Sequence, residues 1–385
     1  MTTIGGVGRP SRAVVLSAAS REGWKAFVDG YRTGIREPRP DVLDLASVPK
    51  GAGWTERHRM TSAASLSLPD IPTDEDGPFG HHWPARYVYE LGAGRVDALS
   101  GLAFVRGSVV KQSGPPLRDP SWVAAVAGSR RRLDDGRAGR RIDGPLLPLG
   151  RDPITGYYHW TVDFLPRILH VRRIFPDVTL VGPKIKTFVR GCLEALDVRF
   201  VETDQVVEAA NIVLADHTEP SWCHPEDAIA LRDWAASIPA PPIGAEKIYV
   251  SRRGARREML NEAAFEETLR SRGFFIADGG SIPDYRTQLG MFAEARLIVG
   301  QHGAGLSNMV WSAGGARVLE LSVEPSGSTP SHESAMVRRL FGSRLFRNLA
   351  AACGHAHERI SVASTDAAAY GDAAEVEPRV LEAID

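Results

Sequence analysis

Short apolar runs and amphipathic stretches alternate along the chain after about residue 90. Runs such as 178–183 are rich in β-branched residues and end at Gly or Pro, which predicts buried strands. Stretches such as 226–238 place apolar residues at helical spacing, which predicts amphipathic helices. The same reasoning predicts strands at 199–203, 247–252, 274–278, 296–300 and 316–322, and helices at 186–198, 261–273 and 284–295. Because strands that alternate with helices favour a parallel sheet with crossover helices, we predict an α/β fold.

A proline cluster divides this pattern into two halves. Residues 239–245 (PAPPIGA) cannot continue the preceding helix, and the alternation of strand and helix restarts after them. We therefore predict two Rossmann-like domains facing a cleft, at 91–240 and 241–350. Residues 1–90 are rich in Pro, Gly, Ser and charge, and we expect an irregular N-terminal extension there. The tail at 351–385 is expected to be helical and to pack back on the N-terminal domain.

Composition narrows the class of protein. The length of 385 residues exceeds one ordinary core, and 43% hydrophobic with 24% charged residues is typical of a soluble globular protein. No apolar run is long enough to span a bilayer and no secretory signal is recognisable, so we expect a cytoplasmic protein. A net charge of −1 gives no electrostatic reason to expect binding to nucleic acid. Cys192, Cys223 and Cys353 are too widely spaced to predict a disulfide framework, and fit a reducing compartment.

The stretch VGQHGAGLSNMVW (299–311) sets a histidine among glycines at the end of an apolar strand. Open α/β sheets bind ligands at the carboxyl ends of their strands, and glycines let the backbone approach a ligand closely. A helix that begins near Leu306 or Ser307 would direct its N–H groups at an anion, so the stretch predicts a phosphate loop to which His302 adds a hydrogen bond or a charge. The alternative is a tight structural turn. Neither the dinucleotide fingerprint nor the P-loop pattern is present.

A second stretch, YVSRRGARREMLNE (249–262), runs from a strand through four arginines to a helix that Asn261 can cap. Guanidinium groups bind phosphate in a bidentate manner, so Arg252 and Arg257 are candidates for a pyrophosphate clamp. The alternative is a solvated charged loop.

A third stretch, GYYHWTVDFLPRI (156–168), places His159, Asp163 and Arg167 on one stripe of a helix that Pro166 should kink or restart. An Asp one turn from a His, in the half opposite the phosphate loop, is a candidate general base. The alternative is a buried His–Asp–Arg network that only anchors the helix.

These three stretches together resemble bacterial members of glycosyltransferase family 61, the capsular polysaccharide biosynthesis type, over roughly residues 90 to 350. The resemblance implies a GT-B fold and an inverting sugar transfer from a nucleotide sugar, with the C-terminal half as the donor domain. It implies donor and phosphate contacts from Arg252, Arg257, His302, Gly303, Ala304, Gly305, Leu306 and Asn308. Glu262, which would reach a ribose, and Gln288 also match family positions. Asp163 would deprotonate the acceptor hydroxyl, with His159 as the second choice.

The implied partners are a nucleotide sugar and a glycan or polysaccharide acceptor, without nucleic acid. The resemblance also allows peripheral association with the inner face of the plasma membrane. No metal cofactor is expected, because the DED at 74–76 lies in a Pro/Gly-rich loop far from the donor half. His81, His82, Cys353, His355 and His357 also lack a ligand pair at zinc spacing.

Two other functions stay open. A hydrolase could use the HGAG string as an oxyanion loop, but no G-x-S-x-G nucleophile elbow occurs in the sequence. A nucleotide-binding or glycan-binding protein of the same fold without turnover is the second alternative.

Overall fold

The computed structural model describes twelve segments of the chain. They are residues 42–45, 55–67, 80–113, 120–135, 139–150, 156–217, 223–241, 243–254, 258–279, 284–325, 345–364 and 373–385. Within these segments, no helix has the length and apolar character that crossing a membrane requires.

The C-terminal half is built on a five-stranded parallel sheet. Its strands are β13 (Lys247–Ser251), β14 (Phe275–Asp278), β15 (Leu297–Gln301), β16 (Arg317–Pro325) and β17 (Ala356–Ser364). Their order in the sheet is β14-β13-β15-β16-β17. The first strand in sequence thus lies between the second and the third, as in flavodoxin-like folds, and this arrangement creates a topological switch point between β13 and β15.

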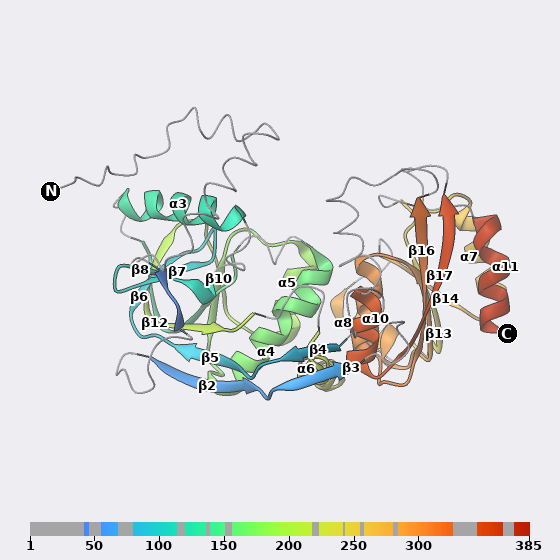
Figure 1. The fold of residues 1–385 in the computed structure, drawn as a ribbon, viewed down its shortest axis with the longest axis horizontal. Coiled ribbons are helices and arrows are strands. Elements are labelled where there is room, and N and C mark those ends of the chain that lie inside the picture. The colour runs from blue at the N-terminus through green and yellow to red at the C-terminus, as the bar shows by residue number, and fades with distance from the viewer. Residues whose placement is uncertain are drawn as a thin grey trace, which may run out of the picture.

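Helices cover both faces of this sheet (Figure 1). The outer face carries α7 (Glu262–Ser271) and α11 (Ala373–Ile384), which pack with Tyr249, Val299 and Leu319 in one apolar cluster. The inner face carries α8 (Tyr285–Ala293), the 3-10 helix η4 (Ala304–Trp311) and α10 (Leu345–Cys353). Burial on both faces explains why these strands read as nearly continuous apolar runs in the sequence.

The N-terminal half is built on a ten-stranded mixed sheet. Its strands are β1 (Val42–Leu43), β2 (Glu56–Thr61), β5 (Arg86–Glu90), β6 (Gly94–Asp97), β7 (Leu102–Val105), β8 (Ser108–Val110), β9 (Arg141–Pro148), β10 (Thr179–Gly182), β11 (Phe200–Glu202) and β12 (Val206–Ala215). The pairs β12–β9, β9–β10 and β10–β11 are parallel, whereas β5 and β6 pair with β12 in the antiparallel direction. Only the parallel part of this sheet therefore resembles a Rossmann fold.

The other elements of this half lie around the sheet. They are the ribbon of β3 (Ala64–Ser67) and β4 (Gly80–Trp83), the short 3-10 helix η2 (Lys111–Ser113), α3 (Pro120–Asp134), the π-helix η3 (His159–Phe164), α4 (Leu165–Ile174), α5 (Thr187–Leu196) and α6 (Pro225–Ser237). Figure 1 shows α4, α5 and α6 on the side of this half that faces the C-terminal half.

The two halves are joined by a shared apolar core. One cluster of buried side chains runs from Leu180 in the N-terminal sheet to Ile298 in the C-terminal sheet. The rings of Trp234, Tyr285 and Trp311 meet at the junction, with centroids 5.9 to 6.2 Å apart. The proline-rich linker packs here as well, since a Cβ on Gly290 of α8 would lie 2.3 Å from the carbonyl oxygen of Pro241.

Two expectations about the ends of the chain were wrong. Residues 1–90 are not only an irregular extension, because β2 and β5 belong to the N-terminal sheet and Val88 is fully buried. The described part of the tail packs mainly on the C-terminal half, and only its first residues touch the N-terminal half, where Arg232 of α6 donates to the Cys353 carbonyl oxygen. It supplies β17, which pairs with β16, and α11, which packs on α7 and β17. β16 thus lies between β15 and β17, and the apolar outer face of the sheet at Leu319 and Leu321 is covered by α11.

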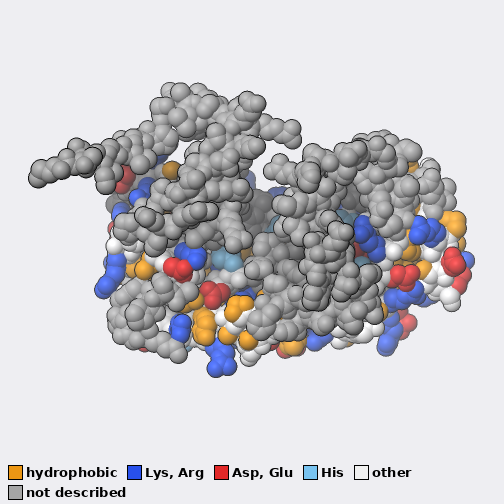
Figure 2. Space-filling view, in the orientation of Figure 1, with side chains coloured by type: hydrophobic (Ala, Val, Ile, Leu, Met, Phe, Trp, Pro, Cys, Tyr) orange, Lys and Arg blue, Asp and Glu red, His pale blue; other side chains and the backbone are white. Residues whose placement is uncertain are grey.

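The visible part of the surface has a balanced charge. Figure 2 shows Lys and Arg interspersed with Asp and Glu on the coloured part of this face.

Candidate active site

A pocket of about 580 Å³ lies at the carboxyl ends of the C-terminal strands. The C-terminal half supplies the ends of β13 and β14, the start of α8 and the glycine loop after β15. The N-terminal half supplies α5 and Tyr157. The lining residues are Tyr157, Thr187, Phe188, Arg190, Gly191, Glu194, Val250, Ser251, Ala277, Gly279, Asp284, Tyr285, Gln288, Gly305 and Asn308. The pocket thus lies at the switch point between β13 and β15, where open α/β sheets bind ligands.

The glycines of the loop after β15 make room for side chains of β13 and its end. A Cβ on Gly303 would lie 1.8 Å from Nη1 of Arg252, and one on Gly305 would lie 2.7 Å from Cγ1 of Val250. The φ of Gly303 is 168°, which is extended backbone that any residue adopts. A side chain at Gly305 would therefore clash with Val250 of β13, whereas one at Gly303 would displace the guanidinium of Arg252. Helix η4 begins at Ala304, two residues before the expected start.

Arg252 is already part of the loop's structure. Its Nη1 donates a hydrogen bond to the carbonyl oxygen of His302 at 2.7 Å, so the guanidinium holds the glycine loop against the end of β13. Arg257, the other arginine of the expected clamp, lies outside the described residues.

Glu262 does not reach the pocket. Its side chain is buried, and it accepts hydrogen bonds from the Tyr249 hydroxyl at 2.9 Å and from the Arg252 backbone N–H at 2.8 Å. Glu262 does not line the pocket, and its contact with a ribose stays a prediction. Glu262 instead anchors the start of α7 to the end of β13.

Asn308 is the centre of a polar network on the pocket wall. Its Oδ1 accepts from Tyr157 at 2.6 Å, from Gln288 at 2.8 Å and from Trp311 at 3.0 Å. Gln288 also donates to the Tyr157 hydroxyl at 2.7 Å, so the network connects η4, α8 and the N-terminal half. Tyr157 was not predicted as a site residue, although it lies within the candidate base stretch at 156–168. Leu306, by contrast, is fully buried in the core.

The candidate base lies on a π-helical turn. The Leu165 N–H donates to the Trp160 carbonyl five residues back, which is the π-type bond. Pro166 explains this turn, because proline has no N–H to donate and its ring would clash with the carbonyl four residues earlier in a regular helix. The expected restart of the helix at Pro166 matches the start of α4 at Leu165.

His159 and Asp163 form the pair that the sequence predicted. His159 Nδ1 lies 2.6 Å from Asp163 Oδ2, and the His159 side chain is 59% exposed whereas that of Asp163 is 21% exposed. Burial raises the pKa of Asp163, although the hydrogen bond to His159 opposes the shift. That hydrogen bond raises the pKa of His159. The second oxygen of Asp163, Oδ1, is buried and makes no hydrogen bond within the described residues.

Arg167 does not complete a triad with these two residues. It is buried and donates to the carbonyl oxygen of Ala215 at 2.8 Å, and its guanidinium lies 4.7 Å from the Phe164 ring centroid. Burial lowers the pKa of Arg167 to about 10. Arg167 therefore anchors α4 to the N-terminal sheet.

Ring contacts bring the π-turn close to the glycine loop. The Phe346 ring of α10 packs edge-on against Tyr158 with centroids 5.9 Å apart, and against His302 with centroids 5.1 Å apart. His302 also contacts Glu320 of β16 through Nδ1. The candidate base and the candidate phosphate loop thus belong to one neighbourhood that α10 covers.

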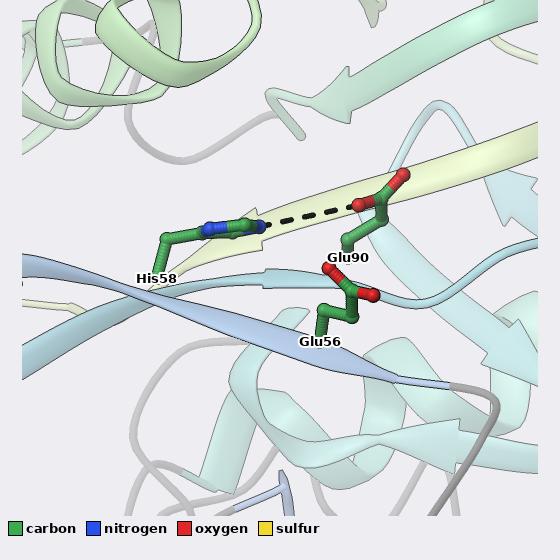
Figure 3. A group of neighbouring side chains, drawn as sticks. All are labelled: Glu56, His58 and Glu90. Carbon is green, nitrogen blue, oxygen red and sulfur yellow. Dashed lines mark ion pairs between the residues drawn. The ribbon is translucent and has the colours of Figure 1, made fainter. Parts of the chain in front are cut away.

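One group among the described residues has its side chains close enough to hold a metal ion. Figure 3 shows Glu56 and His58 from β2 beside Glu90 from β5, with ligand atoms within 4.8 Å of one another. These residues lie on the N-terminal sheet and do not line the pocket. The DED at 74–76 and the side chains of His81 and His82 lie outside the described part.

A comparison of the sequence with protein-family models gives a match. The fold is a Rossmann-like α/β arrangement with a pocket at a switch point. The family model Glycosyltransferase 61 matches residues 157–319, so this segment of the chain is similar to that family. The match is narrower than the expected range of 90 to 350, and it runs from Tyr157 on the pocket wall to β16. No curated protein matches the sequence.

Proposed function

We propose that this protein is an inverting glycosyltransferase that moves a sugar from a nucleotide sugar to a hydroxyl of a glycan or polysaccharide. The observation that carries the proposal is the pocket of about 580 Å³ at the switch point, which the glycine loop and Asn308 line. It has apolar walls with a few polar groups, as pockets for small ligands commonly do.

The donor phosphates would lie against the backbone N–H groups of Gly303, Ala304 and Gly305. Ala304 is exposed and Gly305 is half-buried at the start of η4, whereas Gly303 is buried. His302 and Arg252 would add positive charge as the phosphate departs, which stabilises the leaving group without a metal ion. Tyr157 and Phe188 offer flat walls for a nucleobase.

The acceptor hydroxyl would lose its proton to Asp163 as its oxygen attacks the anomeric carbon on the face opposite the departing phosphate. Burial raises the pKa of Asp163, which makes the carboxylate a stronger base. His159 would orient the carboxylate through its hydrogen bond with Oδ2.

A panel of nucleotide sugars tests the proposal, with release of nucleoside diphosphate measured with and without glycan acceptors. Turnover of one donor, with a product of inverted anomeric configuration by NMR, is the expected result. His302→Ala should reduce both donor affinity and rate, because the residue would contact the phosphate before and during transfer. Tight donor binding without turnover would instead identify a binding protein, and cleavage of p-nitrophenyl esters would identify a hydrolase. A retained anomeric configuration would refute the inverting mechanism.

A further inference from the structure

A buried carboxylate lies directly behind the candidate phosphate loop. Glu320 on β16 is 1% exposed and contacts two histidines, His302 Nδ1 through Oε1 and His357 Nε2 through Oε2, the latter at 2.9 Å. Burial alone would raise the pKa of Glu320, but the hydrogen bonds from His302 and His357 outweigh it and bring the pKa down to about 2. Glu320 is therefore an anion that accepts one hydrogen bond from a ring nitrogen of each histidine.

The sheet register explains how these residues meet. Gly300 of β15 pairs with Glu320 of β16, and Glu320 pairs with Arg359 of β17, so the carboxylate stands on the inner face at the end of the sheet that carries the glycine loop. His302 follows β15 directly, and His357 lies two residues before Arg359. The register therefore brings two histidines 55 residues apart in sequence onto one carboxylate.

Contacts on other sides also restrain the His302 ring. The Phe346 ring packs against it edge-on, and the His302 backbone N–H donates to the carbonyl oxygen of Leu321 at 2.8 Å. Arg252 donates to the His302 carbonyl oxygen. Within the described residues, the ring's hydrogen bonds involve Nδ1 alone, and the side chain is 19% exposed.

We propose that Glu320 is a positioning residue that keeps the proton of His302 on Nδ1 and turns Nε2 toward the donor phosphates, and that His357 holds Glu320 in place. This inference rests on the proposed function and extends its site beyond the family match, which ends at residue 319. A carboxylate that accepts from one nitrogen of a histidine determines which tautomer is present and how the ring is oriented. With the Nδ1 proton held by Glu320, Nε2 lies on the opposite edge of the ring, and it donates a hydrogen bond to a phosphate oxygen when it also carries a proton, in the imidazolium form.

The charged groups around Glu320 come from three strands. His302 follows β15, while His357 and Arg359 stand on β17, and Arg252 at the end of β13 reaches the His302 backbone. Arg359 pairs with Glu320 across the sheet, and its guanidinium donates a hydrogen bond to the Ser322 hydroxyl. A pH profile of turnover therefore reports on Glu320 together with the charged side chains around it.

Glu320→Gln is the main test, with Glu358→Gln on β17 as the matched control, because Glu358 is 48% exposed and contacts Arg317 at the surface. We expect kcat to fall about 10- to 100-fold in Glu320→Gln, as for other groups that orient a functional histidine, while the donor KM changes by less than about threefold. His357→Gln should show a smaller fall in the same direction. The control should retain the wild-type kcat.

Nitrogen-15 NMR of the histidine side chains gives a readout that does not need turnover. The wild-type protein should show His302 protonated at Nδ1, and Glu320→Gln should lose this preference. A wild-type kcat together with an unchanged His302 tautomer in Glu320→Gln would overturn the proposal. If Glu320→Gln does not fold, kcat and the His302 tautomer are measured in His357→Gln instead, and wild-type values of both would overturn the proposal. An enzyme that turns over no donor would remove the proposed function, while the NMR result would still decide whether Glu320 controls the tautomer.

Discussion

Asp163→Asn separates catalysis from stability at the candidate base. Asparagine keeps an oxygen that accepts from His159 Nδ1, where the native bond is 2.6 Å long, but it cannot take a proton from an acceptor hydroxyl. General-base catalysis typically supplies a factor of about 10² to 10⁴, so kcat should fall by that factor while donor affinity stays nearly unchanged.

The same change should cost little stability. The loss of charge weakens a hydrogen bond whose histidine is largely exposed, and it also removes a partly buried carboxylate whose Oδ1 has no described partner. The two effects oppose each other, so we expect the free energy of unfolding to stay within about 1 kcal/mol of the wild-type value at pH 7.

The pH dependence of stability gives a second signature of Asp163. Burial raises the pKa of Asp163 above its ordinary value of 3.8, so the folded state binds more protons than the unfolded state in the window from about pH 4 up to the raised pKa. The free energy of unfolding therefore falls as the pH rises through this window, and Asp163→Asn should reduce that fall.

Turnover with the best donor, titration calorimetry with the nucleoside diphosphate and urea unfolding between pH 4 and 8 measure these effects. Asp216→Asn is the matched control, because burial also raises the pKa of Asp216, which accepts from the Tyr87 N–H and the Tyr89 hydroxyl away from the pocket. The control should change the pH dependence of stability and retain kcat. Full activity in a folded Asp163→Asn protein would refute the assignment and leave His159 as the candidate.

Three further predictions concern the loop and the pocket wall. Arg252→Ala should weaken binding of the nucleoside diphosphate by about 1–3 kcal/mol in calorimetry, because it removes a cation and the bond to the His302 carbonyl, whereas Arg253→Ala should not. Gly303→Ala should displace the Arg252 guanidinium, which lies 1.8 Å from the added Cβ, so the double variant should bind no worse than Arg252→Ala. Asn308→Ala should lower the free energy of unfolding in urea by about 2–4 kcal/mol, because three donors lose one acceptor, and a loss below about 1 kcal/mol would contradict this network.

The elements of the C-terminal half could be predicted from the sequence because their pattern is simple. Parallel strands buried on both faces read as apolar runs, and β13, β14 and β15 start within about one residue of the expected positions. The interruption of the helix before Pro166 was also predictable, because proline has no N–H to donate within a helix. The choice of a π-turn depended on the surrounding packing, which the sequence pattern does not contain.

Strands β10 and β11 of the N-terminal half were predicted, but β2 and β5 were missed because their stabilising contacts are distant in sequence. β2 has exposed charged residues and little alternation, so its sequence lacks a strand signal. β5 carries a charge at a buried position, since Arg86 is 4% exposed and forms a 2.6 Å ion pair with Asp227, 141 residues later. A local pattern assigns such an arginine to the surface, and only the partner explains its burial.

The candidate site shows the same division between local and distant information. His302 could be singled out because glycines and an apolar strand surround it in sequence, and Asp163 because a histidine lies one turn before it. Other residues that decide what these groups can do come from distant parts of the sequence: Phe346 from α10, and Glu320 with His357 from β16 and β17. The places of Glu320 and His357 follow from the strand order, because β16 lies beside β15 and β17 lies beside β16. Since β17 lies in the tail that the sequence pattern had assigned to the other half, the partner of Glu320 could be found only after the sheet was complete.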